Sequence, residues 1–167
     1  SFTSTITNSF YDQNTSGRSD NDGRGVPKTT AQMMTLSTFS DATWSISESG
    51  GFTWSIEQGE TYPYHQWKYG TTAHGISGFA YTGQGTGLIG ANVAIALAVN
   101  GTAITTLGTV NTGANSMYYY LLEDSQLASG NKILAYIDNN ATKGNTVTIA
   151  GSTDLTGLDI YGSTLIV

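Results

Sequence analysis

The 167-residue sequence contains no cysteine and only two prolines. Without thiols, the chain cannot form disulfides, and cysteine can serve neither as a nucleophile nor as a metal ligand. Small secreted eukaryotic domains usually depend on disulfides, and cytosolic enzymes usually retain some thiols. A chain that is cysteine-free, acidic and rich in Thr, Asn and Gly is more typical of large exported bacterial proteins. We therefore predict an extracellular location at a bacterial cell surface.

Charged residues are also scarce. They make up 11% of the chain, against about 25% in typical soluble proteins. The net charge is −6, and the six Lys and Arg residues are scattered along the sequence. Binding to nucleic acid or to an anionic membrane needs clusters of such residues, so neither partner is expected. No apolar run reaches the roughly 20 residues of a membrane-spanning helix, and Gly90 and Asn92 interrupt the best candidate, 88–99. Membrane insertion is therefore not expected.

Aromatic residues, in contrast, are plentiful. They make up 11% of the chain and include ten Tyr and three Trp. Disordered chains usually combine few aromatics with a high net charge. A chain of this length is also long enough for one ordinary domain or two small ones, each with its own core. We expect a packed fold.

The character of the sequence changes near Gly70. All three Trp and both Pro precede this position, whereas the alternating aliphatic runs follow it. We therefore predict two domains, residues 1–70 and residues 71–167.

The first domain is predicted to contain one short helix between strands. Thr29 and Gln32 have the spacing of a capping box, so the helix is expected over residues 29–39. Large apolar residues then alternate with small polar ones in two runs, 43–46 and 52–56. Such alternation is typical of strands with one buried face.

The second domain is predicted to be a series of short strands that forms an antiparallel β-sandwich. Turn signals recur about every 8–12 residues, which favours this all-β architecture. The glycine-rich segment 83–87 opens no helix, so we interpret it as a hairpin turn rather than a phosphate-binding loop. Asn100-Gly101 is a further hairpin signal. The predicted strands cover residues 75–81, 93–99, 102–110, 117–122, 132–137, 146–149 and 155–167.

The sequence offers little for catalysis. His65 and His74 are the only histidines, and no third ligand stands near either one at the spacing of a zinc site. The twelve acidic residues are spread among turns and strand ends, and no pair is marked out for glycoside hydrolysis. We interpret both histidines as structural or surface residues. The prediction is a protein that is not an enzyme, with no catalytic, cofactor-binding or metal-binding residue.

A polar loop of the first domain carries a pattern related to calcium sites. Residues 20–23, Asp-Asn-Asp-Gly, resemble the first half of an EF-hand loop, but the twelfth position is Ala31 instead of glutamate. A looser calcium site formed by Asp12, Asp20 and Asp22 stays open beside the favoured interpretation, which is a set of hydrogen-bonded Asx turns.

Two further sets of residues have a structural and a functional interpretation. Trp44 and Trp54 alternate with Ile, so we predict that they pack in the core rather than form a platform for sugar rings. Asn14, Asn100 and Asn140 begin glycosylation sequons. Chance explains these sequons in a chain so rich in Asn and Thr, and glycosylation is left open.

The first 70 residues contain a recognisable ordered pattern: Asn8-Ser9-Phe10-Tyr11-Asp12, Thr15-Ser16-Gly17, residues 25–33, Phe39, Trp44, Trp54 and Tyr62-Pro63-Tyr64. This pattern resembles the closing segment that follows GLUG-type repeats in filamentous-haemagglutinin-like exoproteins of bacterial two-partner secretion. The resemblance implies the terminal turns and cap of a right-handed β-helix. His65 departs from the pattern, which has an aliphatic residue there.

Residues 74–167 are similar to a module that follows this closing segment in such exoproteins. The similarity rests on residues 76–78, 87–93, 99–101, 112–115, 118–120 and 158–162. The first half of the module also resembles the transthyretin-like, carboxypeptidase-regulatory β-sandwich. Neither family pattern implies catalytic residues.

Two functions follow from these observations. The favoured one is a non-catalytic structural or adhesive segment of a large secreted surface protein, such as an adhesin stalk or a matrix fibre. The alternative is a carbohydrate-binding or glycan-processing accessory module on a secreted β-helix, with a surface glycan as its partner. A glycan array distinguishes the two, because a stalk is expected to bind no glycan tightly.

Both ends of the chain are strand-like, at residues 2–7 and 165–167, as in a segment cut or processed from a longer chain. Open strand edges template association, so we expect contacts with other copies, as in a filament, or with neighbouring segments of the parent chain. Lys at Thr3 and Thr5, or deletion of residues 165–167, is expected to return the chain to monomer.

Overall fold

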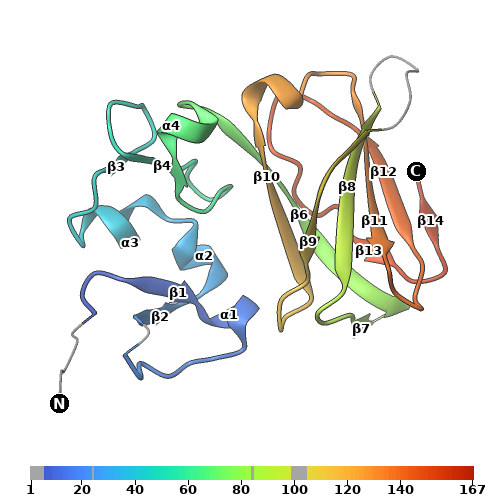
Figure 1. The fold of residues 1–167 in the computed structure, drawn as a ribbon, viewed down its shortest axis with the longest axis horizontal. Helices are drawn as coiled ribbons and strands as arrows, with labels where there is room; N and C mark the ends of the chain where they lie inside the picture. Colours follow the sequence, from blue (N-terminus) through green and yellow to red (C-terminus); the bar gives the residue numbers. More distant parts are fainter. Residues whose placement is uncertain (1–5, 24, 84, 99–104) are drawn as a thin grey trace. The chain divides into compact units, whose positions relative to one another are not determined.

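Strands dominate the computed structural model, which describes residues 6–23, 25–83, 85–98 and 105–167, and the helices are few and short (Figure 1). The fold is all-β, as predicted. The chain divides into two compact units, 1–72 and 73–167.

The first unit combines short strands with four one-turn helices. Its elements are β1 (Phe10–Asp12), α1 (Gln13–Ser16), β2 (Val26–Lys28), α2 (Thr30–Met33), α3 (Leu36–Ser40), β3 (Ile46–Ser47), β4 (Trp54–Ser55), β5 (Tyr64–His65) and α4 (Gln66–Tyr69). β1 pairs with β2 in parallel, and β3 pairs with β4 in parallel. β5 completes the second sheet in antiparallel orientation. Phe39, Ile46 and Ile56 form a small core between these elements.

The single helix predicted over 29–39 is interrupted. Thr29 does cap a helix with the expected box, because its hydroxyl accepts from the Gln32 amide and the Gln32 side chain accepts from the Thr29 amide. However, α2 ends after one turn, and Thr35 is extended before α3 begins. A neighbouring turn satisfies the interrupted backbone, since Gly59 N–H donates to the Met34 carbonyl and Gln58 Oε1 accepts from Leu36 N–H at 2.8 Å. Tertiary hydrogen bonds have replaced those of a continuous helix.

The two strands predicted over 43–46 and 52–56 are each shorter than expected. Thr43 has a positive φ of 65° and belongs to a turn, so β3 begins only at Ile46. Phe52 is exposed, and only Trp54 and Ser55 form β4. Here the alternation correctly marks Ile46, Trp54 and Ile56 as facing the core, but it is wrong at Phe52 and overestimates the length of the sheet.

The second unit contains the longer strands and one 3-10 turn. Its elements are β6 (Ala73–Gly83), β7 (Thr86–Gly87), β8 (Asn92–Ala98), β9 (Thr105–Asn111), β10 (Met117–Glu123), η1 (Asp124–Gln126), β11 (Lys132–Asp138), β12 (Asn145–Ile149), β13 (Ile160–Tyr161) and β14 (Leu165–Ile166). The predicted last strand, 155–167, is therefore two short strands, each of which pairs with a different sheet. Residues 99–101 and the start of the predicted strand 102–110 lie outside the described residues.

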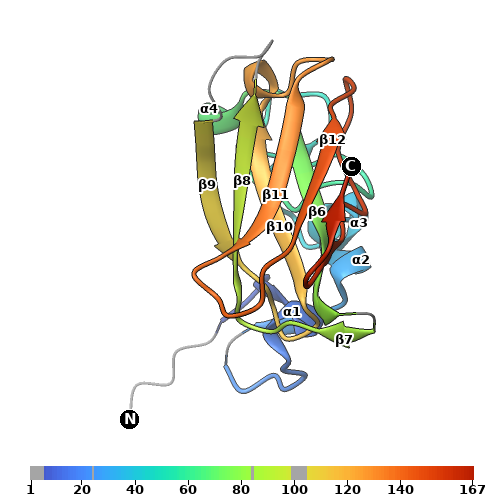
Figure 2. The same cartoon turned by 90° about the vertical axis from the view of Figure 1, so that its right-hand side faces the viewer.

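Two sheets share the core of this unit. One has the order β10-β6-β13 with β7 beside β6, and the other has the order β14-β12-β11-β8-β9. Figure 2 shows the strands of the second sheet side by side from β9 to β14. Alternate residues of each sheet face the common core, among them Ile76 and Tyr118 from the first sheet and Ile95 and Ile133 from the second. The five-stranded sheet therefore has one covered face and one outer face.

Candidate functional site

The open edge of the five-stranded sheet is apolar at β14. β14 pairs with β12 in parallel through only two residue pairs, and β14 ends the strand order. Leu165 is 64% exposed, Ile149 at the end of β12 is 65% exposed, and Val167 is 91% exposed. This edge therefore presents both unpaired backbone and apolar side chains.

The opposite edge, β9, is different. It is rich in threonine, and its pairing with β8 contains a register shift between Ile95 and Ala96. Polar side chains and bulges are features that protect sheet edges from association. The two edges of one sheet therefore differ, because β9 is rich in threonine and has a register shift, whereas β14 is apolar and only two residues long.

The outer face of the same sheet carries a strip along β11 and β12. Ile133, Ala135 and Ile137 of β11 belong to the core. The alternate residues Leu134 and Tyr136 therefore lie on the outer face. Their partners across the ladder are Val147 and Asn145 on β12. On the other side, Tyr136 and Leu134 face Ala94 and Ala96 of β8. Both alanines are covered, with exposed fractions of 0% and 1%, so the exposed surface of this strip belongs to the larger side chains.

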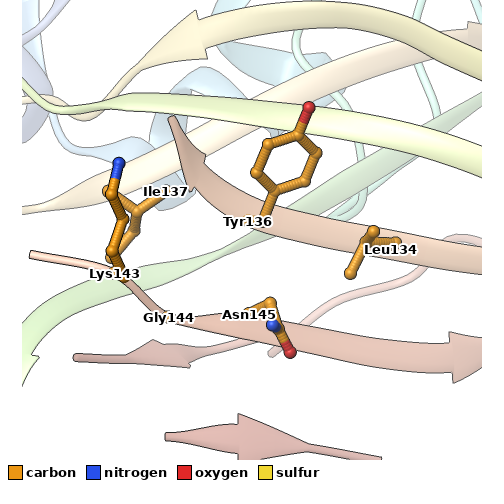
Figure 3. Close-up of a pocket in the computed structure, with 6 residues that line it drawn as sticks. All are labelled: Leu134, Tyr136, Ile137, Lys143, Gly144 and Asn145. Carbon is orange, nitrogen blue, oxygen red and sulfur yellow. The ribbon is translucent and has the colours of Figure 1, made fainter. Parts of the chain in front are cut away.

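Two grooves lie on this strip. One has a volume of about 310 Å³ and is lined by Leu134, Tyr136, Ile137, Lys143, Gly144 and Asn145 (Figure 3). The other has a volume of about 550 Å³ and is lined by Lys132, Val147, Thr148, Ile149 and Val167. Figure 3 shows the ammonium of Lys143 and the hydroxyl of Tyr136 directed the same way. The sequence analysis did not identify this strip.

Asp12, a candidate calcium ligand, is instead saturated by protein donors. It is 8% exposed. Its Oδ1 accepts from the amides of Asn14 at 2.8 Å and Thr15 at 3.2 Å, which caps α1. Its Oδ2 accepts from the hydroxyls of Thr30 at 2.7 Å and Tyr62 at 2.6 Å. Burial, together with this carboxylate, raises the pKa of Tyr62 well above its ordinary value. Asp12 therefore joins four segments of the first unit.

The other two calcium candidates form local turns. Asp20 Oδ1 accepts from the Asp22 amide, and Arg18 lies 3.9 Å from Asp20 Oδ2. Within the described ranges, no group of three His, Asp or Glu side chains is arranged to hold a metal ion. Asx-turn chemistry accounts for the hydrogen bond between Asp20 and Asp22.

His65 lies among aromatic rings rather than acids. It stacks on Trp54 with ring centroids 3.8 Å apart, and its centroid is 5.9 Å from that of Trp67. Trp67 is 79% exposed. Trp44 and Trp54 pack against the small core but are only partly buried, so the prediction of core residues holds for one side of each ring.

His74 is buried between two carboxylates. Its Nε2 lies 3.0 Å from Asp124 Oδ1, and its Nδ1 lies 3.5 Å from Asp154 Oδ1. The Asp154 side chain is 5% exposed, and its Oδ1 accepts from Gly75 N–H at 2.5 Å. Burial raises the pKa of Asp154, and the Gly75 amide and His74 partly oppose this rise. The arrangement ties the start of β6 to η1 and to the loop at residue 154.

Two of the three sequons begin within the described residues, Asn14 in α1 and Asn140 in the bend after β11. Asn14 Oδ1 accepts from the Thr30 amide, and Asn140 Oδ1 accepts from the Thr142 amide, both at 2.9 Å. Asn100 lies outside the described residues. Asn14 therefore links α1 to α2, and Asn140 stabilises its own bend.

Comparison with known proteins gives one partial similarity. No family model matches the chain. A protein of Evansella cellulosilytica described as a "Putative Gly-rich membrane protein" is 46% identical over 61 residues, which is 36% of this chain and 6% of that protein. The matched segment is thus a small part of a much longer relative. Among the residues that the structure describes, no helix has the length and apolar character needed to cross a membrane.

Proposed function

We propose that this chain is a non-catalytic structural or adhesive segment of a large secreted bacterial surface protein, and that it associates through the open β14 edge. The exposed apolar edge of the five-stranded sheet carries the proposal. Unpaired strand edges template the addition of further strands. The partner strand belongs to another copy or to a neighbouring segment of the parent protein.

The similarity to the Evansella protein supports a surface location. That relative is named as a membrane protein, and the matched segment covers only 6% of its length. The resemblance to filamentous-haemagglutinin-like exoproteins, which implies a β-helix cap followed by a β-sandwich module, favours the same function.

The proposal is tested by light scattering over a range of chain concentrations. The native chain is expected to gain mass as concentration rises. The double variant Leu165→Lys, Val167→Lys is expected to stay monomeric and folded, because charge on the edge opposes strand addition. Ile89→Lys is the control, since Ile89 is an exposed apolar residue of the same unit away from this edge. A native chain that stays monomeric, or equal loss of association in Ile89→Lys, would contradict the proposal.

A second candidate function is carbohydrate binding by the first unit. The exposed Trp67, beside the stacked pair of His65 and Trp54, favours it. The face of an exposed aromatic ring is an apolar surface on which a sugar ring can pack. Under this alternative, Trp67→Ala abolishes glycan binding without changing thermal stability or self-association.

A further inference from the structure

The outer strip of the five-stranded sheet combines an aromatic ring, an amide and two ammonium groups. We propose that it binds an acidic saccharide, a carboxylated sugar chain that lies along β11 and β12 from Lys143 to Lys132. The ring of Tyr136 and the side chain of Leu134 would contact the sugar rings, and the lysines would pair with carboxylates. This site goes beyond the structural role proposed above and does not depend on association through β14.

Charge is the first argument. The second unit contains only two cationic side chains, Lys132 and Lys143, beside five acidic residues. Each of the two lysines lines one of the two grooves described on this strip. No ion pair of either lysine is found in the part of the chain that the structure describes. The strip also carries Asp138 on the same face of β11, so its net charge is +1, whereas the second unit as a whole is acidic. This local excess of positive charge complements an anionic ligand.

The spacing of the lysines suits an extended ligand. Tyr136 pairs with Asn145, and Ile137 N–H donates to the Gly144 carbonyl, so Lys143 lies level with the far end of β11. The seven residues from Lys132 to Asp138 span about 20 Å at the rise of a β-strand. Both grooves open on this line. A chain with repeated carboxylates can therefore reach both lysines while it covers Tyr136.

The amide of Asn145 is the second argument. Its Oδ1 is covered and has no hydrogen-bond partner among the described residues. Because this atom is covered, it becomes available to a ligand only when the side chain turns, and no acceptor bond within the described residues opposes that turn. Ligand sites are typically apolar surfaces with a few polar groups that fix the ligand's orientation. Asn145 and Lys143 supply such groups beside the ring of Tyr136.

A saccharide fits this strip better than a peptide does. A peptide strand gains affinity from backbone hydrogen bonds at a sheet edge. β11 pairs on both sides, and β12 pairs with β11 along its length and with β14 at Asn145 and Thr146, so the backbone under Tyr136 is not open for such bonds. The strip offers side chains only. The hydroxyls of a sugar can form hydrogen bonds with an amide, its carboxylates can pair with an ammonium, and its ring can pack against an aromatic face.

The test is a titration of the intact chain with oligogalacturonate, at a concentration where scattering shows only monomer. The methyl ester of the same oligosaccharide, which lacks the charge, and oligoglutamate, which lacks the sugar, are the comparison ligands. We expect oligogalacturonate to bind, both comparison ligands to bind at least tenfold more weakly, and added salt to weaken binding. Equal binding of the ester, preferred binding of oligoglutamate, or no binding of oligogalacturonate overturns the proposal.

Variants locate the site. Lys143→Gln changes an exposed side chain and is expected to weaken binding about threefold. Tyr136→Ala is expected to weaken it about tenfold, with folding checked by circular dichroism. Asp138→Asn removes an acid from the same face of β11 and is expected to strengthen binding about twofold. Lys68→Gln, a matched loss of charge in the first unit, should change nothing. Equal effects of Lys143→Gln and Lys68→Gln would assign the binding to net charge and overturn the site.

Discussion

The carboxylate of Asp12 shows how a single side chain can organise a unit with a small core. Four donors from α1, α2 and Tyr62 converge on it. Buried carboxylates are stable only when such donors replace water. In the first unit, three residues form the buried core cluster. The hydrogen bonds to Asp12 therefore hold together segments that apolar packing would hold together in a larger core.

We predict that Asp12→Ala lowers the free energy of unfolding of the first unit by about 3 kcal/mol, because it removes a helix cap and leaves buried donors unpaired. Asp12→Asn keeps an acceptor for the cap and should cost about 1 kcal/mol. Urea unfolding followed by Trp fluorescence measures this, because all three Trp lie in residues 1–72. A cost below about 1 kcal/mol for Asp12→Ala would show that the carboxylate is not the organising group.

At the scale of elements, the segment 155–159 is attached to β6 by close backbone contact. Ser77 N–H donates to the Leu155 carbonyl at 2.9 Å, and Leu158 N–H donates to the Ser77 carbonyl at 3.0 Å. The Tyr118 hydroxyl also donates to the Leu158 carbonyl. Gly78 permits this approach, because a Cβ there would collide with the carbonyl of Leu158. This segment leads into β13 and so joins the end of the chain to the first sheet.

We therefore predict that Gly78→Ala destabilises the second unit by about 3 kcal/mol, since the backbone must move to admit a methyl group. Gly83→Ala is the matched control on the same strand, where a Cβ would meet nothing within 4 Å. Its cost should stay within about 0.5 kcal/mol. Thermal unfolding followed by circular dichroism compares the two, and similar midpoints would refute the close-contact explanation.

At the scale of the whole molecule, each unit has a core made from its own residues. Units of this kind usually unfold as separate cooperative transitions. Hydrogen exchange resolved by peptide can assign protection to each unit.

We predict that Asp12→Ala lowers protection in residues 6–72 and leaves residues 105–167 unchanged, whereas Gly78→Ala does the reverse. The physical reason is that each substitution disturbs the contacts of one unit only. The native chain under the same conditions is the reference. Loss of protection in both units from either substitution would show that the chain unfolds as one body.

The sequence by itself predicts the all-β class, the capping box at Thr29 and the positions of most strands of the second unit. These features depend on local properties: alternation of apolar residues, turn chemistry and the hydrogen bonds of neighbouring residues. The low content of charged residues and the scatter of Lys and Arg along the chain are also properties of the sequence alone, so the expectation of no nucleic-acid partner needs no structure.

Only the tertiary structure decided where the proposed binding surface lies. Lys132, Leu134 and Tyr136 alternate with core residues on one strand, and both faces of that strand carry large apolar side chains. Periodicity therefore could not say which face is covered. Lys143 and Asn145 join them only through the pairing of β11 with β12. The break between α2 and α3 has the same cause, because residues 58 and 59, distant in sequence, supply the hydrogen bonds that replace helical ones. Contacts between segments far apart in the chain decide such features, and no local pattern records them.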